Sequence, residues 1–138
     1  MKNVRMVVVG IVVILMSMPS VMGQMAKKMD TKVIAVINRA DWCPVCQANG
    51  KRAMAEFDMY KKDPSIKFVV NDVTNDNTKM KSAETLQKYG LEKEMEGKKA
   101  TGVVYFFNAE TKELISQISV SKSDKELSSA IDMAKGKS

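Results

Sequence analysis

The feature that most constrains this chain is a pair of cysteines, Cys43 and Cys46, with Pro44 and Val45 between them. They are the only two cysteines among 138 residues. A disulfide between residues so close in sequence closes a loop that adds little stability, because the stabilisation by a cross-link grows with loop length. The pair is therefore expected to serve chemistry rather than to hold the fold together.

The pair lies at the junction of a predicted strand and a predicted helix. Residues 32–38 (KVIAVIN) form a short β-branched run with polar neighbours, which predicts a buried strand. A helical pattern then extends to about Tyr60, and Pro44 falls in its first turn, where the missing N–H costs nothing. Gly50 inside this helix costs about 1 kcal/mol relative to alanine, so we expect a bend or a close contact there. The apolar positions of the helix are Cys46, Ala53, Met54 and Phe57.

The middle of the chain predicts a second strand and a second helix. Residues 66–72 (IKFVVND) form the strand. Residues 78–89 form the helix, with Met80, Ala83 and Leu86 along one face. Gly90 followed by Leu91 is a typical helix stop. Residues 91–99 are expected to be a charged connector.

The last third predicts a hairpin and a closing helix. Residues 103–107 (VVYFF) and 114–120 are two strands joined by a tight connection. Ser123 and Glu126 form a capping box that opens the final helix. The order β-α-β-α-β-β-α predicts an α/β fold with a central mixed sheet flanked by helices.

The N-terminus has the pattern of a secretory signal peptide. Lys2 and Arg5 precede an apolar run from Met6 to Met18, and Pro19 then breaks the run. We therefore predict a signal peptide at residues 1–23 and one mature domain at residues 24–138. The alternative is an uncleaved anchor through residues 6–22, which is near the lower length limit for crossing a bilayer.

Charge and composition exclude several classes of protein. The net charge is +6, yet Lys and Glu are interspersed, and no basic stripe interleaves with aromatic residues, so nucleic acid is not an expected partner. There is no glycine-rich phosphate loop, and we expect no cofactor. A zinc site needs four ligands, whereas the chain offers two cysteines and no histidine. No metal site is predicted within one chain.

A C-x-x-C pair at the start of a helix is suited to thiol chemistry. Backbone N–H groups and the helix dipole favour a negative charge on the first sulfur. The pKa of such a thiol falls from about 8.5, which makes it a nucleophile near neutral pH. We assign Cys43 as the nucleophile and Cys46 as the resolving thiol, which attacks a mixed disulfide formed by Cys43.

Residues 30–135 resemble the thioredoxin family. The resemblance is carried by Trp42-Cys43-Pro44-Val45-Cys46 after the strand VIAVIN, and by the segment from Tyr89-Gly90 through VVYFFN to the hairpin. It implies a thioredoxin-like fold and the activity of a thiol–disulfide oxidoreductase. The sequence Ala40-Asp41-Trp42-Cys43 is especially similar to thioredoxin-like proteins that are exported to the periplasm.

The chain departs from that family in the groups around the cysteines. The buried acid of the family falls at Ile37, and its lysine partner falls at Val70, so Cys46 lacks an obvious base. Water or Asp41 is the proposed substitute. The family's cis-proline position falls at Thr101, with Gly102 as the second choice. The Thr101 hydroxyl could donate to the Cys43 thiolate, or the replacement could be neutral and leave a looser groove.

These observations predict an exported enzyme that reduces protein disulfides, with oxidation as the close second direction. The expected partners are exported disulfide-bonded proteins and a membrane or periplasmic electron donor. The expected location is periplasmic or otherwise extracytoplasmic. Two alternatives remain: a thioredoxin-fold binding or redox-sensing module without turnover, and a dimer that holds a metal or Fe–S cluster through the cysteine pairs of both chains. Arg39 and Lys51 are nearby cations that could lower the pKa of Cys43.

Overall fold

The structure, a computed structural model, describes residues 30–138. The predicted signal segment lies outside the described residues. In chain order the elements are β1 (Val33–Arg39), α1 (Pro44–Asp58), β2 (Ile66–Asp72), α2 (Asp76–Lys88), α3 (Glu92–Met95), β3 (Val103–Asn108), β4 (Leu114–Ser119) and α4 (Asp124–Gly136).

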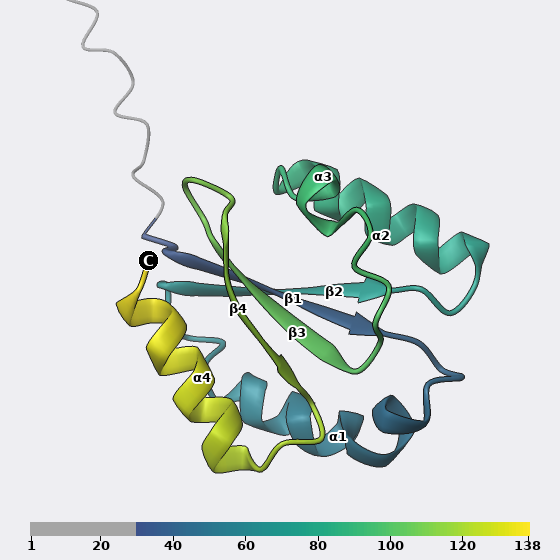
Figure 1. The fold of residues 1–138 in the computed structure, drawn as a ribbon, viewed down its shortest axis with the longest axis horizontal. Helices are drawn as coiled ribbons and strands as arrows, with labels where there is room; N and C mark the ends of the chain where they lie inside the picture. The colour runs from purple at the N-terminus through teal and green to yellow at the C-terminus, as the bar shows by residue number, and fades with distance from the viewer. Residues whose placement is uncertain (1–29) are drawn as a thin grey trace, which may run out of the picture.

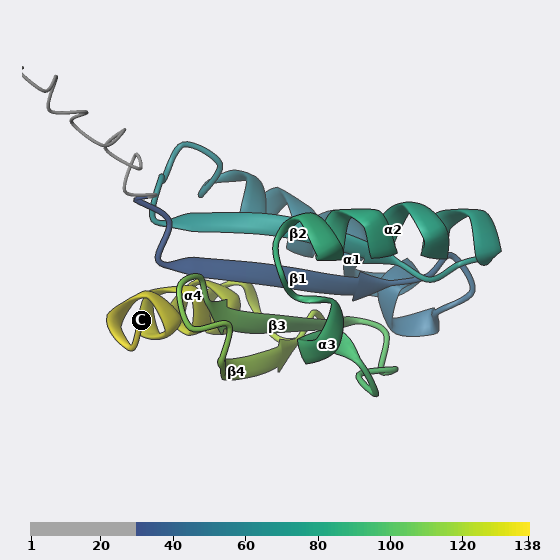
Figure 2. The same ribbon diagram turned by 90° about the horizontal axis from the view of Figure 1, so that it is seen from above.

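The strands form one mixed sheet in the order β2-β1-β3-β4, which Figure 2 shows across the molecule. β1 pairs with β2 in parallel, and the helical crossover α1 connects them. β3 pairs antiparallel with both β1 and β4, and β3 and β4 form the expected hairpin. The prediction of a mixed sheet flanked by helices, with a thioredoxin-like order of elements, is therefore confirmed.

Helices cover both faces of the sheet (Figure 1). Val33, Ala35 and Ile37 of β1 belong to the core that α1 and α4 cover. Ile34 and Val36 alternate with them and belong to the core against α2 and α3. A central strand that is buried on both faces must be apolar throughout, which explains the β-branched run that predicted it.

The helix ends follow the signals in the sequence. Gly90 has a φ of +68°, as expected after α2. The N–H of Leu91 bonds the carbonyl of Leu86, and the N–H of Gly90 bonds that of Gln87, which is the Schellman arrangement. At the start of α4 the side chains of Ser123 and Glu126 form the predicted capping box.

Three residues on the apolar faces of the predicted helices are exposed. Met80 is 62% exposed, Met54 is 37% exposed, and Ala83 is also exposed. The inward residues of α2 are Ser82 and Leu86. The Ser82 hydroxyl accepts a hydrogen bond from the N–H of Asp72 at 2.8 Å. A polar contact therefore helps to determine which face of α2 is buried. The spacing of apolar residues could not predict this contact, because Ser82 is polar.

The connector at residues 91–99 is more structured than predicted. It contains the single-turn helix α3, and Met95 of this helix is only 7% exposed. Leu91 is fully buried beside it. The connector therefore packs on the sheet through two apolar side chains, while most of its charged residues are exposed. Within residues 30–138, none of the helices is both long enough and apolar enough to cross a membrane.

Candidate active site

The two cysteines lie at the start of α1, shortly after the end of β1. Cys43 is the N-cap residue of α1, with extended backbone (φ −80°, ψ 115°), and Pro44 follows in the first turn as predicted. The N–H of Cys46 donates to the Cys43 sulfur at 3.2 Å. A helix N-terminus leaves backbone N–H groups without intrahelical partners, and here the Cys43 sulfur satisfies one of them.

The two thiols have opposite pKa shifts. Burial opposes the thiolate of Cys43, but hydrogen bonds from the Cys46 and Thr101 side chains and from the backbone of Cys46 and Val45 outweigh it and lower its pKa. Burial also acts on Cys46, and the hydrogen bond with Cys43 adds to it, so the pKa of Cys46 is raised. Both cysteines are free thiols. Of the two thiols, Cys43 is therefore the one that ionises more readily.

Thr101 and Gly102 are the loop residues next to the cysteine motif. Hydrogen bonding by the Thr101 side chain is one of the causes of the lowered pKa of Cys43. Gly102 has a φ of +73°, and a Cβ built there would lie 2.8 Å from Cγ1 of Val45. Among residues 30–138 there is no cis peptide bond. Of the two positions considered from the sequence, Thr101 faces the nucleophile and Gly102 allows close approach to the motif.

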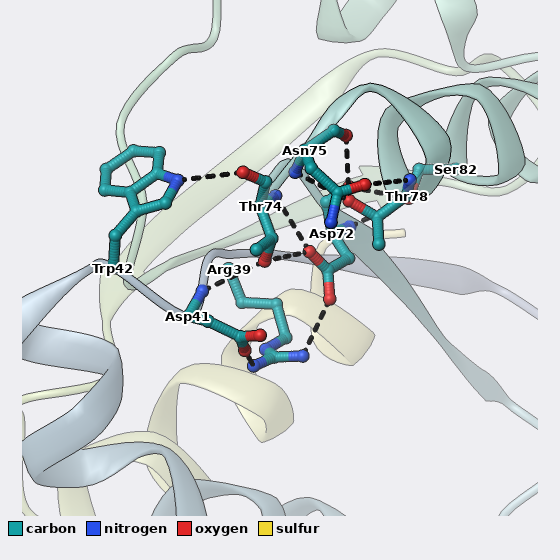
Figure 3. Close-up of polar contacts among 8 residues, drawn as sticks. All are labelled: Arg39, Asp41, Trp42, Asp72, Thr74, Asn75, Thr78 and Ser82. Carbon is teal, nitrogen blue, oxygen red and sulfur yellow. Dashed lines mark hydrogen bonds and ion pairs between the residues drawn. The ribbon is translucent and has the colours of Figure 1, made fainter.

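Hydrogen bonds connect the start of the motif to the loop after β2 (Figure 3). The indole N–H of Trp42 donates to the carbonyl of Thr74 at 3.2 Å, and the N–H of Asp41 donates to the Thr74 hydroxyl at 3.0 Å. Asp72 accepts from the N–H of Thr74 at 2.9 Å. The Trp42 ring remains 59% exposed. The motif therefore begins on an anchored backbone with an exposed aromatic ring.

Asp41 is engaged by a cation rather than by a cysteine. Its carboxylate forms an ion pair with Arg39, and the same guanidinium bonds Asp72 at 2.7 Å (Figure 3). Within the described residues no hydrogen bond joins Asp41 to either sulfur. The Arg39 charge lowers the pKa of Cys46, partly offsetting its burial, so this cation acts on the resolving thiol rather than on Cys43. The structure thus gives no support to Asp41 as the base for Cys46.

A cavity of about 360 Å³ lies behind the second cysteine. Ile37 and Val70 are neighbours across β1 and β2, as the family positions imply, and their apolar side chains line this cavity. The contact expected at Gly50 is absent, since a Cβ there would meet nothing within 4 Å. The full lining is Ile37, Asn38, Arg39, Cys46, Gly50, Lys51, Ala53, Met54, Phe57, Val70, Gly102 and Val120.

Two buried asparagines near the site were not anticipated. Asn38 ends the apolar run of β1 and is 1% exposed, and Asn71 on β2 is 8% exposed. The Asn71 amide donates to the Asn38 side-chain oxygen at 2.7 Å. A polar residue that closes a buried strand is the only signal for them in the sequence, and strand ends commonly carry such residues. Their partners in a distant loop are visible only in the fold.

The sheet order defines a thioredoxin-like fold, and the cysteine pair lies at the N-terminus of α1 in this fold. No family model and no curated protein matches the sequence. Solved structures with a similar fold include a thioredoxin-like protein (Trxlp) from Edwardsiella tarda, at 18% identity over 74% of this chain and 84% of that one, with a TM-score of 0.42. Thioredoxin Mala s 13 from Malassezia sympodialis matches at 16% identity over 78% and 81%, with a TM-score of 0.45.

A third solved structure is a secreted disulfide oxidoreductase from Mycobacterium tuberculosis that is homologous to E. coli DsbE. It is 16% identical over 74% of this chain and 81% of that chain, with a TM-score of 0.48. These likenesses concern the fold. The chemistry of the present chain has to be derived from its own residues.

Proposed function

We propose that this protein is an exported thiol–disulfide oxidoreductase that reduces protein disulfides through Cys43 and Cys46. One observation carries the proposal: the pKa of Cys43 is lowered and that of Cys46 is raised, at the N-terminus of one helix. A dithiol enzyme needs this division, since the thiolate is the attacking species and the second thiol must hold its proton until the mixed disulfide forms.

In the first step the Cys43 thiolate attacks one sulfur of a substrate disulfide. A bond forms between Cys43 and that sulfur, the substrate S–S bond breaks, and the other substrate sulfur leaves as a thiolate that takes a proton from water. Cys43 itself is only 3% exposed, whereas Trp42 and Val45 beside it are 59% and 38% exposed. The substrate is therefore expected to dock on these apolar neighbours and present its sulfur from there.

In the second step Cys46 loses its proton and attacks the Cys43 sulfur. The Cys43–Cys46 disulfide forms, and the remaining substrate sulfur leaves as a thiolate. The substrate gains two electrons and the dithiol loses two, so a dithiol donor must reduce the enzyme again. Water in the cavity behind Cys46 is the proposed proton acceptor, and the Arg39 charge favours the thiolate that results.

The signal pattern at residues 1–23 supports the export part of the proposal. Outside the cytoplasm, disulfides form and persist, so a reductase there has substrates. The proposed partners are exported disulfide-bonded proteins and a membrane or periplasmic donor. Retention of residues 6–22 would tether the domain to the membrane, and N-terminal sequencing of the protein from a membrane and a soluble fraction distinguishes cleavage from tethering.

The test is the reduction potential of the pair in the purified protein, measured in dithiothreitol and glutathione buffers. A value near about −270 mV identifies a reductant, and a value near about −120 mV identifies an oxidant and overturns the proposed direction. Cys43→Ser is expected to abolish reduction of a disulfide-bonded substrate. Cys46→Ser is expected to accumulate a mixed disulfide at Cys43, detectable by mass.

Two results would replace the proposal with one of its alternatives. A pair that cycles reversibly but reduces no protein disulfide supports a redox-sensing module. Metal or a cluster in the purified dimer, lost in Cys43→Ser, supports a metal site shared between two chains.

A further inference from the structure

Thr101 belongs to the loop between α3 and β3. Near the start of this loop the N–H of Lys98 donates to the carbonyl of Met95 at the end of α3, and the N–H of Lys99 donates to that of Gly97. The carbonyls of Lys98 and Ala100 point instead toward the end of β1. Both carbonyls make part-buried hydrogen bonds there, so their partner at the end of β1 helps to determine where the loop lies.

Asn38 supplies that partner. Its side-chain amide donates to the carbonyl of Lys98 at 2.8 Å and to that of Ala100 at 3.2 Å. An amide nitrogen has two hydrogens, and both are used. The backbone carbonyl of Asn38 also accepts from the N–H of Gly102 at 2.8 Å. Asn38 therefore bonds the loop immediately before and immediately after Thr101.

Asn71 fixes the orientation of the Asn38 amide. The two residues are register partners on the parallel strands β1 and β2, and the Asn71 amide donates to the Asn38 oxygen at 2.7 Å. That bond prevents the Asn38 amide from turning its oxygen toward the loop carbonyls. Both asparagine side chains are buried, and so is the hydrogen bond between them, so water does not compete for that bond.

We propose that Asn38 and Asn71 form a positioning pair that holds the loop at residues 98–102 so that the Thr101 hydroxyl lies against the Cys43 sulfur. The proposal rests on the thiol chemistry proposed above and names the residues that prepare the nucleophile for it. The Thr101 hydroxyl donates to the thiolate, and the asparagine pair acts through Thr101 without touching either cysteine. A loop free to shift by the length of one hydrogen bond would lose this contact.

The groups that act on the Cys43 charge can be separated by mutation. Those with side chains are Cys46 and Thr101, and backbone N–H groups of Val45 and Cys46 complete the set. The cation Arg39 acts on Cys46. Thr101 is thus the one member of this set that the asparagine pair positions directly.

The experiment measures the rate of alkylation of Cys43 by iodoacetamide against pH in the full-length reduced protein, with peptide mapping to separate Cys43 from Cys46. Below the pKa the rate follows the thiolate fraction. Thr101→Val is expected to slow alkylation at neutral pH by roughly threefold to tenfold, the range for loss of one hydrogen bond. Thr101→Ser keeps the hydroxyl and is expected to keep the rate near that of the wild type.

Asn38→Leu removes the amide at similar volume and is expected to slow alkylation in the same direction. In the Thr101→Val background the same substitution is expected to add nothing, because the hydroxyl that it positions is gone. Ile131→Val in α4 is the matched control for lost packing, since Ile131 is fully buried and remote from the loop. It is expected to lower the melting temperature without changing the pH profile of Cys43.

Three results would overturn the proposal: an unchanged profile in Asn38→Leu, an unchanged profile in Thr101→Val, or an equal effect of Asn38→Leu with and without the Thr101 hydroxyl. If Asn38→Leu does not fold, Asn71→Ala replaces it, and faster hydrogen exchange at the Gly102 amide is the added readout. Unchanged exchange there would also contradict the proposal. Because alkylation requires no substrate turnover, failure of the enzymatic proposal and failure of the positioning pair are distinguishable.

Discussion

Gly102 lies directly against Val45, the residue between Pro44 and Cys46: a Cβ built on Gly102 would approach Cγ1 of Val45 to 2.8 Å. The same glycine has a φ of +73°, a backbone angle that residues with a side chain rarely adopt. Its N–H donates to the carbonyl of Asn38, and its carbonyl accepts from the N–H of Val120. The backbone at Gly102 therefore cannot move away from Val45 without losing these two hydrogen bonds. The motif and the loop that faces it are therefore in contact through a position that requires glycine.

Gly102→Ala is expected to lower the free energy of unfolding by about 2 kcal/mol or more, because backbone strain and a steric contact add. Urea denaturation measures the loss. Adding Val45→Ala to this variant is expected to restore the stability lost to the steric contact, but not the stability lost to backbone strain. A double variant no more stable than Gly102→Ala would show that the contact with Val45 is not a source of the strain.

Two other glycines test backbone conformation with no steric contribution. A Cβ at Gly50 or at Gly97 would meet nothing within 4 Å, but only Gly97 has a positive φ, of +78°. Gly50→Ala is expected to stabilise α1 by about 0.5–1 kcal/mol, and Gly97→Ala is expected to destabilise the protein by about 1 kcal/mol. Thermal melting of the two variants measures both signs. A loss of stability in Gly50→Ala would indicate that α1 needs to bend there.

Arg39 is one of the groups that favour ionisation of the resolving thiol Cys46. Its charge lowers the pKa of Cys46 against the larger effect of burial. Arg39→Met is expected to raise that pKa and to slow alkylation of Cys46 roughly twofold to fivefold at neutral pH, measured in Cys43→Ser so that one thiol reacts. The difference should vanish well above the pKa, where the thiolate is fully formed in both proteins.

Lys51→Met is the control for the Arg39 prediction. Lys51 lines the same cavity and carries the same charge, but its side chain is exposed. Solvent screening predicts a smaller effect there. Equal effects of the two substitutions would mean that the general positive charge, and not the placement of Arg39 between Asp41 and Asp72, acts on Cys46.

The ion pair between Asp63 and Lys135 ties α4 to the loop before β2. Hydrogen bonds from Lys135 and Ser65 lower the pKa of Asp63 to about 2. A lowered folded-state pKa adds stability above the unfolded value, and this stability is lost as the pH falls from about 4 to about 2. Lys135→Met is expected to cost about 1 kcal/mol at pH 7.

Denaturant titrations at several pH values measure this effect. The difference between the wild type and Lys135→Met should shrink as the pH falls below 4 and disappear only below pH 2, where Asp63 is protonated in both proteins. Lys137→Met, at the exposed C-cap position of α4, should change stability by less than about 0.5 kcal/mol at any pH. A pH-independent cost in Lys135→Met would instead point to its packing on Tyr60, whose ring centre lies 6.0 Å from the Lys135 nitrogen.

Much of the fold follows from local signals in the sequence. The β-branched run that became β1, the Gly90 stop and the Ser123 capping box each depend on residues close together in the chain, so each could be predicted and is confirmed. The position of Cys43 at the start of α1 also follows locally, because Pro44 marks the first turn. The inward faces of α1 and α2 were predicted in part only, since Met54 and Met80 are exposed.

Local signals were enough to predict two thiols at the N-terminus of a helix that packs on a mixed sheet. The groups around these thiols depend on tertiary structure: the loop partners of Asn38 lie 60 and 62 residues away, and Arg39 bonds Asp72 across 33 residues. Hydrophobic periodicity and capping residues predict local structure, because they depend on residues that are close together in the chain. Hydrogen bonds between buried polar groups depend on which distant segments the folded chain brings together, and no local pattern records that.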